Sequence, residues 1–423
     1  MSTFTKKIGL VFGVISGLLL STTTVMVTAA ESVDDSLHYQ QSLRDTYREQ
    51  WAATWSSPPT AAGTAFEPAK IFENQTIRQT TRVSLGGQRF RVRISNAFGT
   101  KALKIGAAHL AVQSSGAAII PGTDRALKFS GLPSIAIPAG AVALSDPIDL
   151  SVAARTVLSV SMYVPENTGA ATYVEGVNQN TYISGPGDFT GATELPVTET
   201  VTSTYFISVI EVAARKNASV VVAFGDSVTK GATATNWPAF LFGRLNNNYG
   251  TQKMAVVNQG IGCNRTLRDF CGPSAAARFD RDVLAVTGAT HVILALGLVD
   301  IIFPSVSGNL AEVATTSDII VGLKQLTERA RARGLKVYGA TITPFGDSIF
   351  AGVYTPENEA TRQAVNRWIR TSGAYDGVID FDKVVRDPAD PKRMWPIYTL
   401  DGIHPNDAGN ELMANAVNLA LFD

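Results

Sequence analysis

The stretch Ser219-Val220-Val221-Val222-Ala223-Phe224-Gly225-Asp226-Ser227 decides the predicted fold of the C-terminal half. Its apolar run, Val220 to Phe224, is short and continuous, which is typical of a parallel strand covered on both faces. Similar runs follow at Met254 to Val257, Val292 to Leu296, Val337 to Thr341 and Val378 to Phe381. We therefore expect five parallel strands in this half.

Helical patterns separate these runs. One extends from about Thr316 to Arg333 and stops at Gly334, and a second has Thr355 as N-cap, Pro356 in its first turn and Gly373 at its end. A final helix follows Pro405-Asn406. The alternation predicts a flavodoxin-like three-layer α/β/α sandwich with a five-stranded parallel sheet, whose ligand site lies at the carboxyl ends of the strands.

The N-terminal half has a period of two. Arg89 to Ile94 alternates polar and apolar residues, and the preceding Leu85-Gly86-Gly87-Gln88 predicts a hairpin turn. Residues 157–163 alternate in the same way, which predicts one buried and one wet face. Together these signals indicate an antiparallel β-sandwich domain over residues 51–212, followed by the α/β domain over residues 218–423.

The N-terminus resembles a secretory signal peptide. Lys6-Lys7 precedes an apolar run from Ile8 to Leu20, and small residues end at Ala30. We expect cleavage near Ala30 and a secreted or periplasmic protein, with an uncleaved membrane anchor as the alternative. A polar segment, residues 31–50, with a helical pattern follows, and no later stretch is predicted to span the membrane.

Composition argues against nucleic-acid binding. The 423 residues carry 36 Lys and Arg against 36 Asp and Glu, so no basic excess is present. Only two cysteines occur, Cys263 and Cys271, which are too few for a four-cysteine zinc site. In an oxidising compartment they are expected to form one local disulfide, and two free buried thiols are the alternative. The sequence does not indicate an oligomeric state.

Two short motifs carry candidate chemistry. Ser227 directly follows the first predicted parallel strand, which places its hydroxyl at the carboxyl edge of the sheet near a helix N-terminus. Asp401 precedes His404 by three residues, so its carboxylate can accept a hydrogen bond from Nδ1 and direct Nε2 toward a hydroxyl. The other histidines, His38, His109 and His291, lie in less suitable surroundings.

The chain resembles the SGNH or GDSL hydrolases, and in particular their exported two-domain members with a β-rich front part. The resemblance rests on four blocks that occur in the family's order: Phe224-Gly225-Asp226-Ser227, Asn258-Gln259-Gly260-Ile261, Leu296-Gly297-Leu298-Val299-Asp300 and Asp401-Gly402-Ile403-His404-Pro405. It implies a serine esterase that removes acyl groups from small esters, lipids or polysaccharides and uses no metal or cofactor.

The resemblance also implies roles for individual residues. Ser227 is the nucleophile, His404 the general base and then acid, and Asp401 the residue that orients the histidine. The backbone N–H of Ser227 is one oxyanion donor, and the family's second donor, a glycine, aligns with Cys263. The third, an asparagine side chain, aligns with Val299, which has no donor. Asn264 is a candidate replacement.

These departures predict a slow esterase. Loss of one oxyanion donor lowers kcat by about 10² to 10³, and a Cβ at position 263 strains the loop if φ is positive there. We expect an exported serine ester hydrolase that acts through an acyl-enzyme on short acyl esters, including O-acylated carbohydrate. Its only predicted partner is a small-molecule or polysaccharide substrate. The alternative is a non-catalytic or weakly active glycan-binding protein on the same fold.

Overall fold

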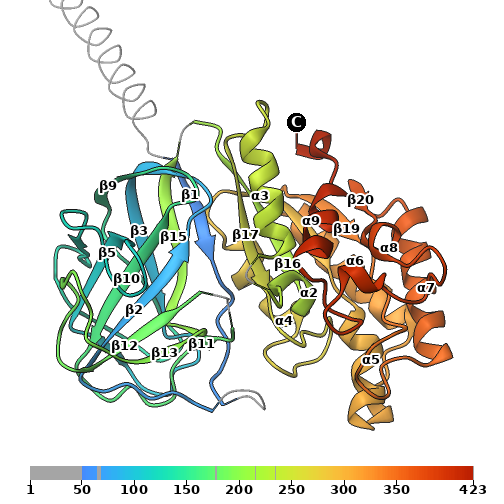
Figure 1. Cartoon of the computed structure of the whole chain (residues 1–423), viewed down its shortest axis with the longest axis horizontal. Helices are drawn as coiled ribbons and strands as arrows, with labels where there is room; N and C mark the ends of the chain where they lie inside the picture. The colour runs from blue at the N-terminus through green and yellow to red at the C-terminus, as the bar shows by residue number, and fades with distance from the viewer. Residues whose placement is uncertain (1–49, 64–67, 177–178, 215, 234, 423) are drawn as a thin grey trace, which may run out of the picture. The chain divides into compact units, whose positions relative to one another are not determined.

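The computed structural model describes residues 50–422, apart from 64–67, 177–178, 215 and 234. The described residues form one compact unit, which begins at Gln50. It comprises a β-rich region followed by an α/β region (Figure 1). The predicted signal peptide, and the polar segment up to residue 49, lie outside the described residues.

The α/β region is built on a five-stranded parallel sheet, as predicted. In spatial order its strands are β17 (Met254–Gly260), β16 (Ser219–Gly225), β18 (Ala289–Ala295), β19 (Lys336–Ala340) and β20 (Gly377–Ile379). All four pairings are parallel. This is the flavodoxin-like order 2-1-3-4-5, and the order reverses next to β16, so the loops after β16, β17 and β18 meet at one edge.

The three predicted helices begin at the residues that the sequence indicates. Thr315 caps α6 (Thr316–Arg331) in a capping box with Asp318, and Thr355 caps α7 (Pro356–Thr371). Asn406 caps α9 (Asp407–Asn415). The last predicted strand is shorter than expected, because Asp380 caps a helix that begins at Phe381.

The remaining helices are shorter or less regular. They are α2 (Ser227–Lys230), α3 (Trp237–Asn247), α4 (Ala275–Phe279), α5 (Leu298–Ser307), α8 (Phe381–Val385), the π-helical turn η1 (Asp280–Leu284) and the 3₁₀ turns η2 (Leu310–Glu312), η3 (Pro396–Tyr398) and η4 (Leu419–Phe422). None of the helices within the described residues combines the length and apolarity that a membrane span requires.

The β-rich region consists of antiparallel strands in several sheets. The larger sheet contains β13 (Val197–Val201), β12 (Thr181–Pro186), β2 (Gln75–Arg82), β10 (Val157–Val164), β5 (Ala107–Val112) and β6 (Arg125–Ala126). The second contains β1 (Gln50–Ser56), β15 (Ile207–Ala214), β3 (Gly87–Ser95) and β8 (Val142–Leu144), with β9 (Ile148–Val152) also paired to β3. Two short pairs join β11 (Tyr173–Val174) to β14 (Thr204–Tyr205) and β4 (Leu103–Ile105) to β7 (Ile135–Ile137).

The predicted hairpin at Leu85-Gly86-Gly87-Gln88 is wrong. β2 pairs with β10 and β12, whereas β3 pairs with β15, β8 and β9, so the chain passes from one sheet to the other at this point. Gly86 is required there by close packing, since a Cβ would lie 2.4 Å from the carbonyl oxygen of Val152.

The predicted wet face of β10 is also wrong. Ser159 and Ser161 are as buried as their apolar neighbours, because loops cover this side of the sheet. Buried Arg78 holds these loops, since its guanidinium donates to Ser161 Oγ at 2.8 Å and to the carbonyl oxygens of Ala117 and Ala192 at 2.8 and 2.7 Å. From its sequence alone, a strand that is buried on both faces looks like a half-exposed strand when the second face carries small hydroxyl side chains.

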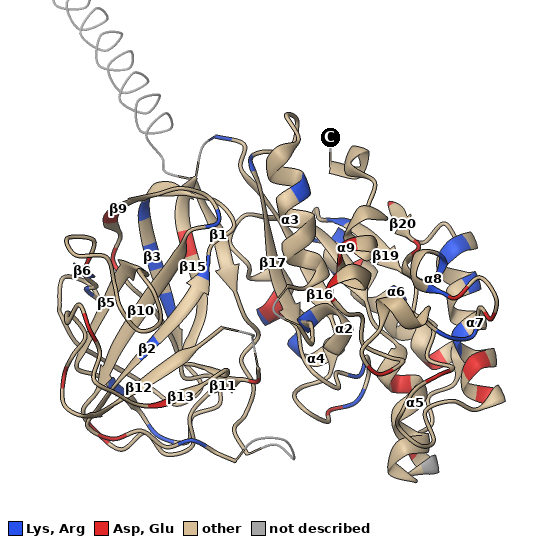
Figure 2. Cartoon of the chain, viewed as in Figure 1, with Lys and Arg blue, Asp and Glu red and all other residues tan. Residues whose placement is uncertain are grey.

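Polar contacts join the two regions. Ser84 Oγ donates to the carbonyl oxygen of Val256 on β17 at 2.7 Å, and Gln259 Nε2 at the end of β17 donates to Ser56 Oγ at 2.7 Å. Basic residues of β3 lie beside acidic residue Glu211 of β15 (Figure 2), which also accepts from Thr287 Oγ1 of the α/β region at 2.7 Å. The β-rich region therefore contacts the strand that leads into one loop of the candidate site.

Candidate active site

The chain turns sharply between β16 and α2, and Ser227 lies at this turn. Asp226 caps α2, because its carboxylate accepts a hydrogen bond from Val228 N at 3.0 Å. Gly225 has no room for a side chain, since a Cβ would lie 2.1 Å from Thr229 Oγ1 and 2.6 Å from the carbonyl oxygen of Ala295. Ser227 is the first residue of α2, so its hydroxyl and its N–H are both at the helix N-terminus.

The structure brings Ser227, His404 and Asp401 together. His404 Nε2 lies 3.0 Å from Ser227 Oγ, and His404 Nδ1 lies 2.7 Å from Asp401 Oδ2. The serine and the histidine are 177 residues apart in the sequence. This is a hydrogen-bonded chain of hydroxyl, imidazole and carboxylate, with each group within reach of the next.

Asp401 is fixed as an acceptor. Its other oxygen accepts hydrogen bonds from the backbone N–H groups of Ile403 and His404 at 3.0 and 2.8 Å. Burial alone would raise the pKa of Asp401, but the hydrogen bonds from the side chain and backbone of His404 outweigh it and lower the pKa to about 2. The carboxylate is therefore ionised at neutral pH and can stabilise a protonated His404.

The loop after β17 carries Cys263 in the backbone conformation that favours glycine. Its φ is +54°, in the left-handed region, where a residue with a Cβ is strained. Among the described residues, none accepts a hydrogen bond from the backbone N–H of Ser227 or of Cys263. Both N–H groups therefore have no protein acceptor within the described residues, and they belong to the two residues for which the resemblance implies backbone oxyanion donors.

The third position lacks a donor. Val299 lies in the first turn of α5 and is buried, so an apolar isopropyl group occupies this place. Asn264 does not compensate for it. Its Nδ2 donates to the carbonyl oxygen of Pro273 at 2.9 Å and its Oδ1 accepts from Arg278 at 3.0 Å, so the amide is held within its own loop.

The predicted disulfide is not formed. Cys263 and Cys271 are both free thiols in the structure, which corresponds to the alternative raised by the sequence. The interaction of the two thiols lowers the pKa of Cys263 and raises that of Cys271. The backbone between them is held by, among others, the hydrogen bond from Phe270 N to the carbonyl oxygen of Gly272 at 3.1 Å.

Arg278 is a positioning residue that sequence reasoning missed. Its fully buried guanidinium donates to the carbonyl oxygens of Gly225 and Gln259, both at 2.9 Å. It also donates to Asn264 Oδ1, and Asp282 balances its charge at 3.1 Å. One side chain therefore fixes the ends of β16 and β17 and the loop that carries Cys263. An arginine in a helix with no nearby motif gives no signal of this role in a single sequence.

Asp300 also fixes the loop after β17, which carries Cys263. Its carboxylate accepts from the backbone N–H of Thr266 at 2.8 Å and from Thr266 Oγ1 at 2.7 Å. Burial raises the pKa of Asp300, and these hydrogen bonds oppose the rise. The loop after β18 is in this way tied to the loop after β17, although its Val299 supplies no donor.

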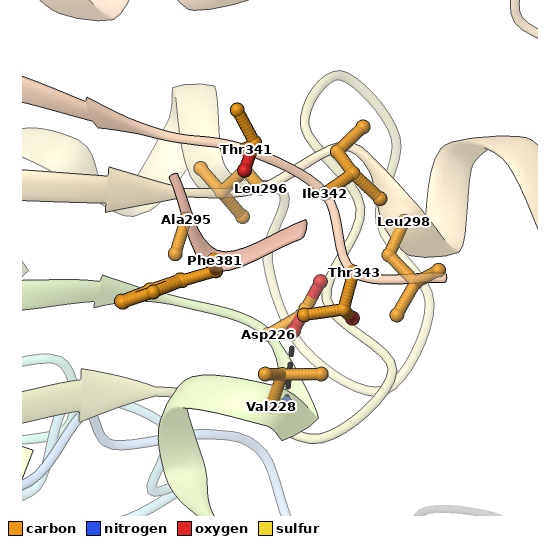
Figure 3. A pocket seen from close by; sticks show the side chains of 9 residues that line it. All are labelled: Asp226, Val228, Ala295, Leu296, Leu298, Thr341, Ile342, Thr343 and Phe381. Atoms are coloured by element: carbon orange, nitrogen blue, oxygen red, sulfur yellow. Dashed lines mark hydrogen bonds between the residues drawn. The ribbon is translucent and has the colours of Figure 1, made fainter. Parts of the chain in front are cut away.

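A small cavity lies behind the nucleophile turn. Its volume is about 20 Å³, enough for one water molecule, and Asp226 and Thr343 lie on its wall (Figure 3). Burial raises the pKa of Asp226 to about 7, against the hydrogen bond from Val228 N and the charge of His404. Asp226 is therefore close to half-protonated at neutral pH.

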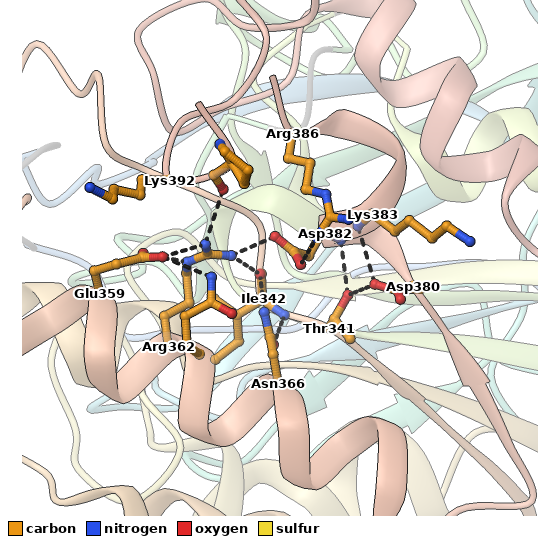
Figure 4. A network of polar contacts seen from close by, with 12 residues as sticks. Thr341, Ile342, Glu359, Arg362, Asn366, Asp380, Asp382, Lys383, Arg386 and Lys392 are labelled. Atoms are coloured by element: carbon orange, nitrogen blue, oxygen red, sulfur yellow. Dashed lines mark hydrogen bonds and ion pairs between the residues drawn. The ribbon is translucent and has the colours of Figure 1, made fainter. Parts of the chain in front are cut away.

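Behind this cavity, a buried polar network holds the segment that follows β19 (Figure 4). Asn366 Oδ1 accepts from Ile342 N at 2.7 Å, and Asn366 Nδ2 donates to Ile342 O at 2.8 Å. Arg362 reaches the same carbonyl oxygen at 3.2 Å and pairs with Asp382 at 2.6 Å and Glu359 at 2.8 Å. The network fixes one wall of the cavity, and the charge of Arg362 is balanced by Glu359 and Asp382.

The other described histidines lie away from the triad. His109 Nδ1 lies 2.7 Å from Asp124 Oδ2 in the β-rich region. His291 stacks on Tyr338 with ring centroids 5.9 Å apart, and burial lowers the pKa of His291 to about 4. Both have satisfied structural surroundings, and His38 lies outside the described residues.

One known protein family matches the α/β region of the chain. Residues 223–412 match the model of the GDSL-like Lipase/Acylhydrolase family. No curated protein matches the chain significantly.

Several solved structures resemble part of the chain. A GDSL-like lipase from Bacteroides thetaiotaomicron is 18% identical and aligns over 49% of this chain and 90% of its own, with a TM-score of 0.38. An acetylxylan esterase from Geobacillus stearothermophilus, solved as a catalytic mutant, is 19% identical over 49% of this chain and 96% of its own, with a TM-score of 0.39. An aryl esterase from M. smegmatis is 17% identical over 47% of this chain and 96% of its own, with a TM-score of 0.38.

Proposed function

We propose, on the premise that residues 223–412 form a GDSL-like lipase/acylhydrolase domain, that the protein is a serine ester hydrolase that acts through an acyl-enzyme. The observation that carries the proposal is the hydrogen-bonded chain from Ser227 through His404 to Asp401, with contacts of 3.0 and 2.7 Å. A nucleophile, a base and a group that orients the base are the elements that acyl transfer requires.

In the first half of the reaction, Ser227 Oγ bonds to the ester carbonyl carbon while His404 Nε2 takes the hydroxyl proton. The N–H groups of Ser227 and Cys263 stabilise the negative charge on the carbonyl oxygen. When the tetrahedral intermediate collapses, the bond to the alcohol oxygen breaks, and His404 gives its proton to the departing alcohol. Asp401 holds the imidazolium throughout this step.

In the second half, water replaces the alcohol. His404 accepts a proton from the water as its oxygen bonds to the acyl carbon, and the bond to Ser227 Oγ then breaks as the serine recovers a proton from His404. The products are one alcohol and one carboxylic acid. With Val299 at the third donor position, acylation and deacylation both proceed with two backbone donors, which is why we expect a slow enzyme.

The proposed substrates are short acyl esters, among them O-acylated carbohydrate. We further propose that residues 1–30 are a signal peptide and that the protein is exported, with a β-sandwich domain at 51–212 and the hydrolase domain at 218–423. N-terminal sequencing of the exported protein tests the cleavage near Ala30.

Labelling with a fluorophosphonate tests the proposed nucleophile. The full chain is expected to form a covalent adduct on Ser227, and Ser227→Ala is expected to form none. Ser372→Ala, at the C-terminal end of α7, is the matched control and is expected to label like the wild type. A folded wild-type protein that does not label would favour the alternative, a glycan-binding protein on this fold, for which the apolar Val299 and the strained Cys263 are the supporting observations.

A further inference from the structure

A charged pair joins the β-rich region to the nucleophile helix. Lys230 is the last residue of α2, whose first residue is Ser227. Glu175 follows β11 directly, and its Oε1 lies 3.5 Å from Lys230 Nζ. The lysine side chain is 16% exposed and the glutamate side chain 33%, so both charges are partly removed from water. The β-rich region thereby places a carboxylate at the edge where the triad lies.

The pair lies against the loop that carries Cys263. A Cβ built on Gly262 would lie 3.0 Å from Glu175 Oε2 and 3.5 Å from Lys230 Nζ. Gly262 therefore allows both charges to approach the backbone one residue before Cys263. In agreement with this closeness, Glu175 raises and Lys230 lowers the pKa of the Cys263 thiol.

Charge at this place acts on the reaction. Negative charge develops on the substrate oxygen between the N–H groups of Ser227 and Cys263, and a partly buried ammonium nearby stabilises it more than the same group in water. Val299 leaves the oxyanion with fewer donors than the family pattern has, so the surrounding potential carries a larger share of its stabilisation. A carboxylate next to the ammonium reduces that potential.

We propose that Lys230 contributes electrostatic stabilisation to the oxyanion and that Glu175, from the β-rich region, positions the ammonium and attenuates its charge. This inference rests on the proposed function. Glu175 and Lys230 are not groups that touch the reacting atoms; they set the potential around them. The β-rich region is then a part of the catalytic apparatus that tunes the rate.

A purely structural pair gives a different pattern of effects. If the two side chains only fasten the β-rich region to the loop, loss of either one loosens the same contact and both substitutions lower activity. If the pair sets the potential, Lys230→Met leaves an uncompensated negative charge and Glu175→Gln leaves an uncompensated positive charge. The two substitutions then change kcat in opposite directions.

The experiment measures kcat and KM for p-nitrophenyl acetate with Lys230→Met, Glu175→Gln, the double variant and Lys230→Arg. We expect kcat to fall by roughly threefold to tenfold in Lys230→Met and to rise by a similar factor in Glu175→Gln, with KM little changed. The double variant and Lys230→Arg are expected within about twofold of the wild type. Lys70→Met and Glu199→Gln, at an ion pair confined to the β-rich region, serve as controls, and thermal unfolding checks that each variant is folded.

Opposite changes in kcat support the proposal. Equal-sign changes, or no change, in Lys230→Met and Glu175→Gln overturn it while the wild type still hydrolyses the ester through Ser227, so the proposed function survives that result. If Lys230→Met does not fold, Glu175→Gln decides alone, and an unchanged or lower kcat overturns the inference. A wild type with no Ser227-dependent turnover overturns both proposals.

Discussion

The two halves of the site differ in how closely they keep the family's residues. The half proposed to move protons consists of Ser227, His404 and Asp401, which are joined by contacts of 3.0 and 2.7 Å. The half proposed to stabilise charge has Cys263 at φ +54° and Val299, at the two positions where the resemblance implies a glycine and an asparagine. In the proposed site the two halves share the turn at Ser227, but the base comes from the loop before α9 and the remaining charge-stabilising positions from the loops after β17 and β18, so the latter can change while the base is kept.

Removing a triad member should have the largest effect. His404→Ala is expected to lower kcat on p-nitrophenyl acetate by about 10⁶, and Asp401→Asn by about 10⁴, because the base is lost in one case and misoriented in the other. Steady-state kinetics with correctly folded protein measures both. Comparable rates in Asp401→Asn and wild type would mean that Asp401 does not orient the base and that the two halves do not differ as described.

Asp226 caps the helix that begins at Ser227, and its burial predicts a pH-dependent stability. Its pKa is raised from 3.8 to about 7 in the folded protein, so the folded state favours the protonated carboxyl group. The resulting stability is fully present below pH 4 and is lost as the pH rises toward 7, by up to a few kcal/mol.

Denaturant unfolding at a series of pH values tests this contribution. In Asp226→Asn the fall in the free energy of unfolding between pH 4 and pH 7 should be smaller than in the wild type. Parallel pH profiles for the two proteins would show that burial does not raise the pKa of Asp226 in the folded protein.

Placing a side-chain donor at position 299 tests whether the half of the site proposed to stabilise charge lacks one. Val299→Asn is expected to raise kcat by roughly 10- to 100-fold if the amide reaches the oxyanion, because one donor contributes about 10² to 10³. Val299→Leu, which has a branched side chain like that of asparagine but no hydrogen-bond donor, is the control. A kcat that is unchanged or lower in Val299→Asn would indicate that this position does not face the oxyanion, or that another group already serves it.

Removing the backbone strain at position 263 is expected to have the smallest effect of these substitutions, and it acts on stability. Cys263→Gly and Cys263→Ala both remove the thiol contact with Cys271, but only glycine relieves the positive φ. We expect Cys263→Gly to be more stable than Cys263→Ala by about 1 kcal/mol, as measured by thermal or denaturant unfolding. Equal stabilities would show that the loop relaxes away from the left-handed conformation.

Much of the fold was predictable because its signals are local. Continuous apolar runs identified all five parallel strands, and Thr355, Pro356 and Asn406 located helix starts that the structure confirms. The hairpin before β3 and the exposure of Ser159 and Ser161 were predicted wrongly, because both depend on which sheet or loop covers a strand. Strand pairing and loop cover are both set by residues far away in the sequence. Arg78, for example, holds the loops that cover Ser159 and Ser161.

The site was predictable only in part for the same reason. The motifs around Ser227 and His404 indicated which residues meet, but the free thiols, the captured amide of Asn264 and the guanidinium of Arg278 depend on contacts across several loops. A pair of cysteines eight positions apart gives no information on whether the thiols bond covalently. Glu175 lies in a stretch with no common motif, and Lys230, although it lies three residues after Ser227, carries no signal of its pairing with Glu175 in the sequence.

The most direct test of the central claim is hydrolysis of p-nitrophenyl acetate by the full chain beside Ser227→Ala, with butyrate as a second substrate. We predict measurable turnover by the wild type and a rate reduced to background in the equally folded variant, and the ratio of acetate to butyrate hydrolysis measures the size of the acyl pocket. Equal background rates in the wild type and Ser227→Ala would contradict the claim that the assembled triad is a working esterase.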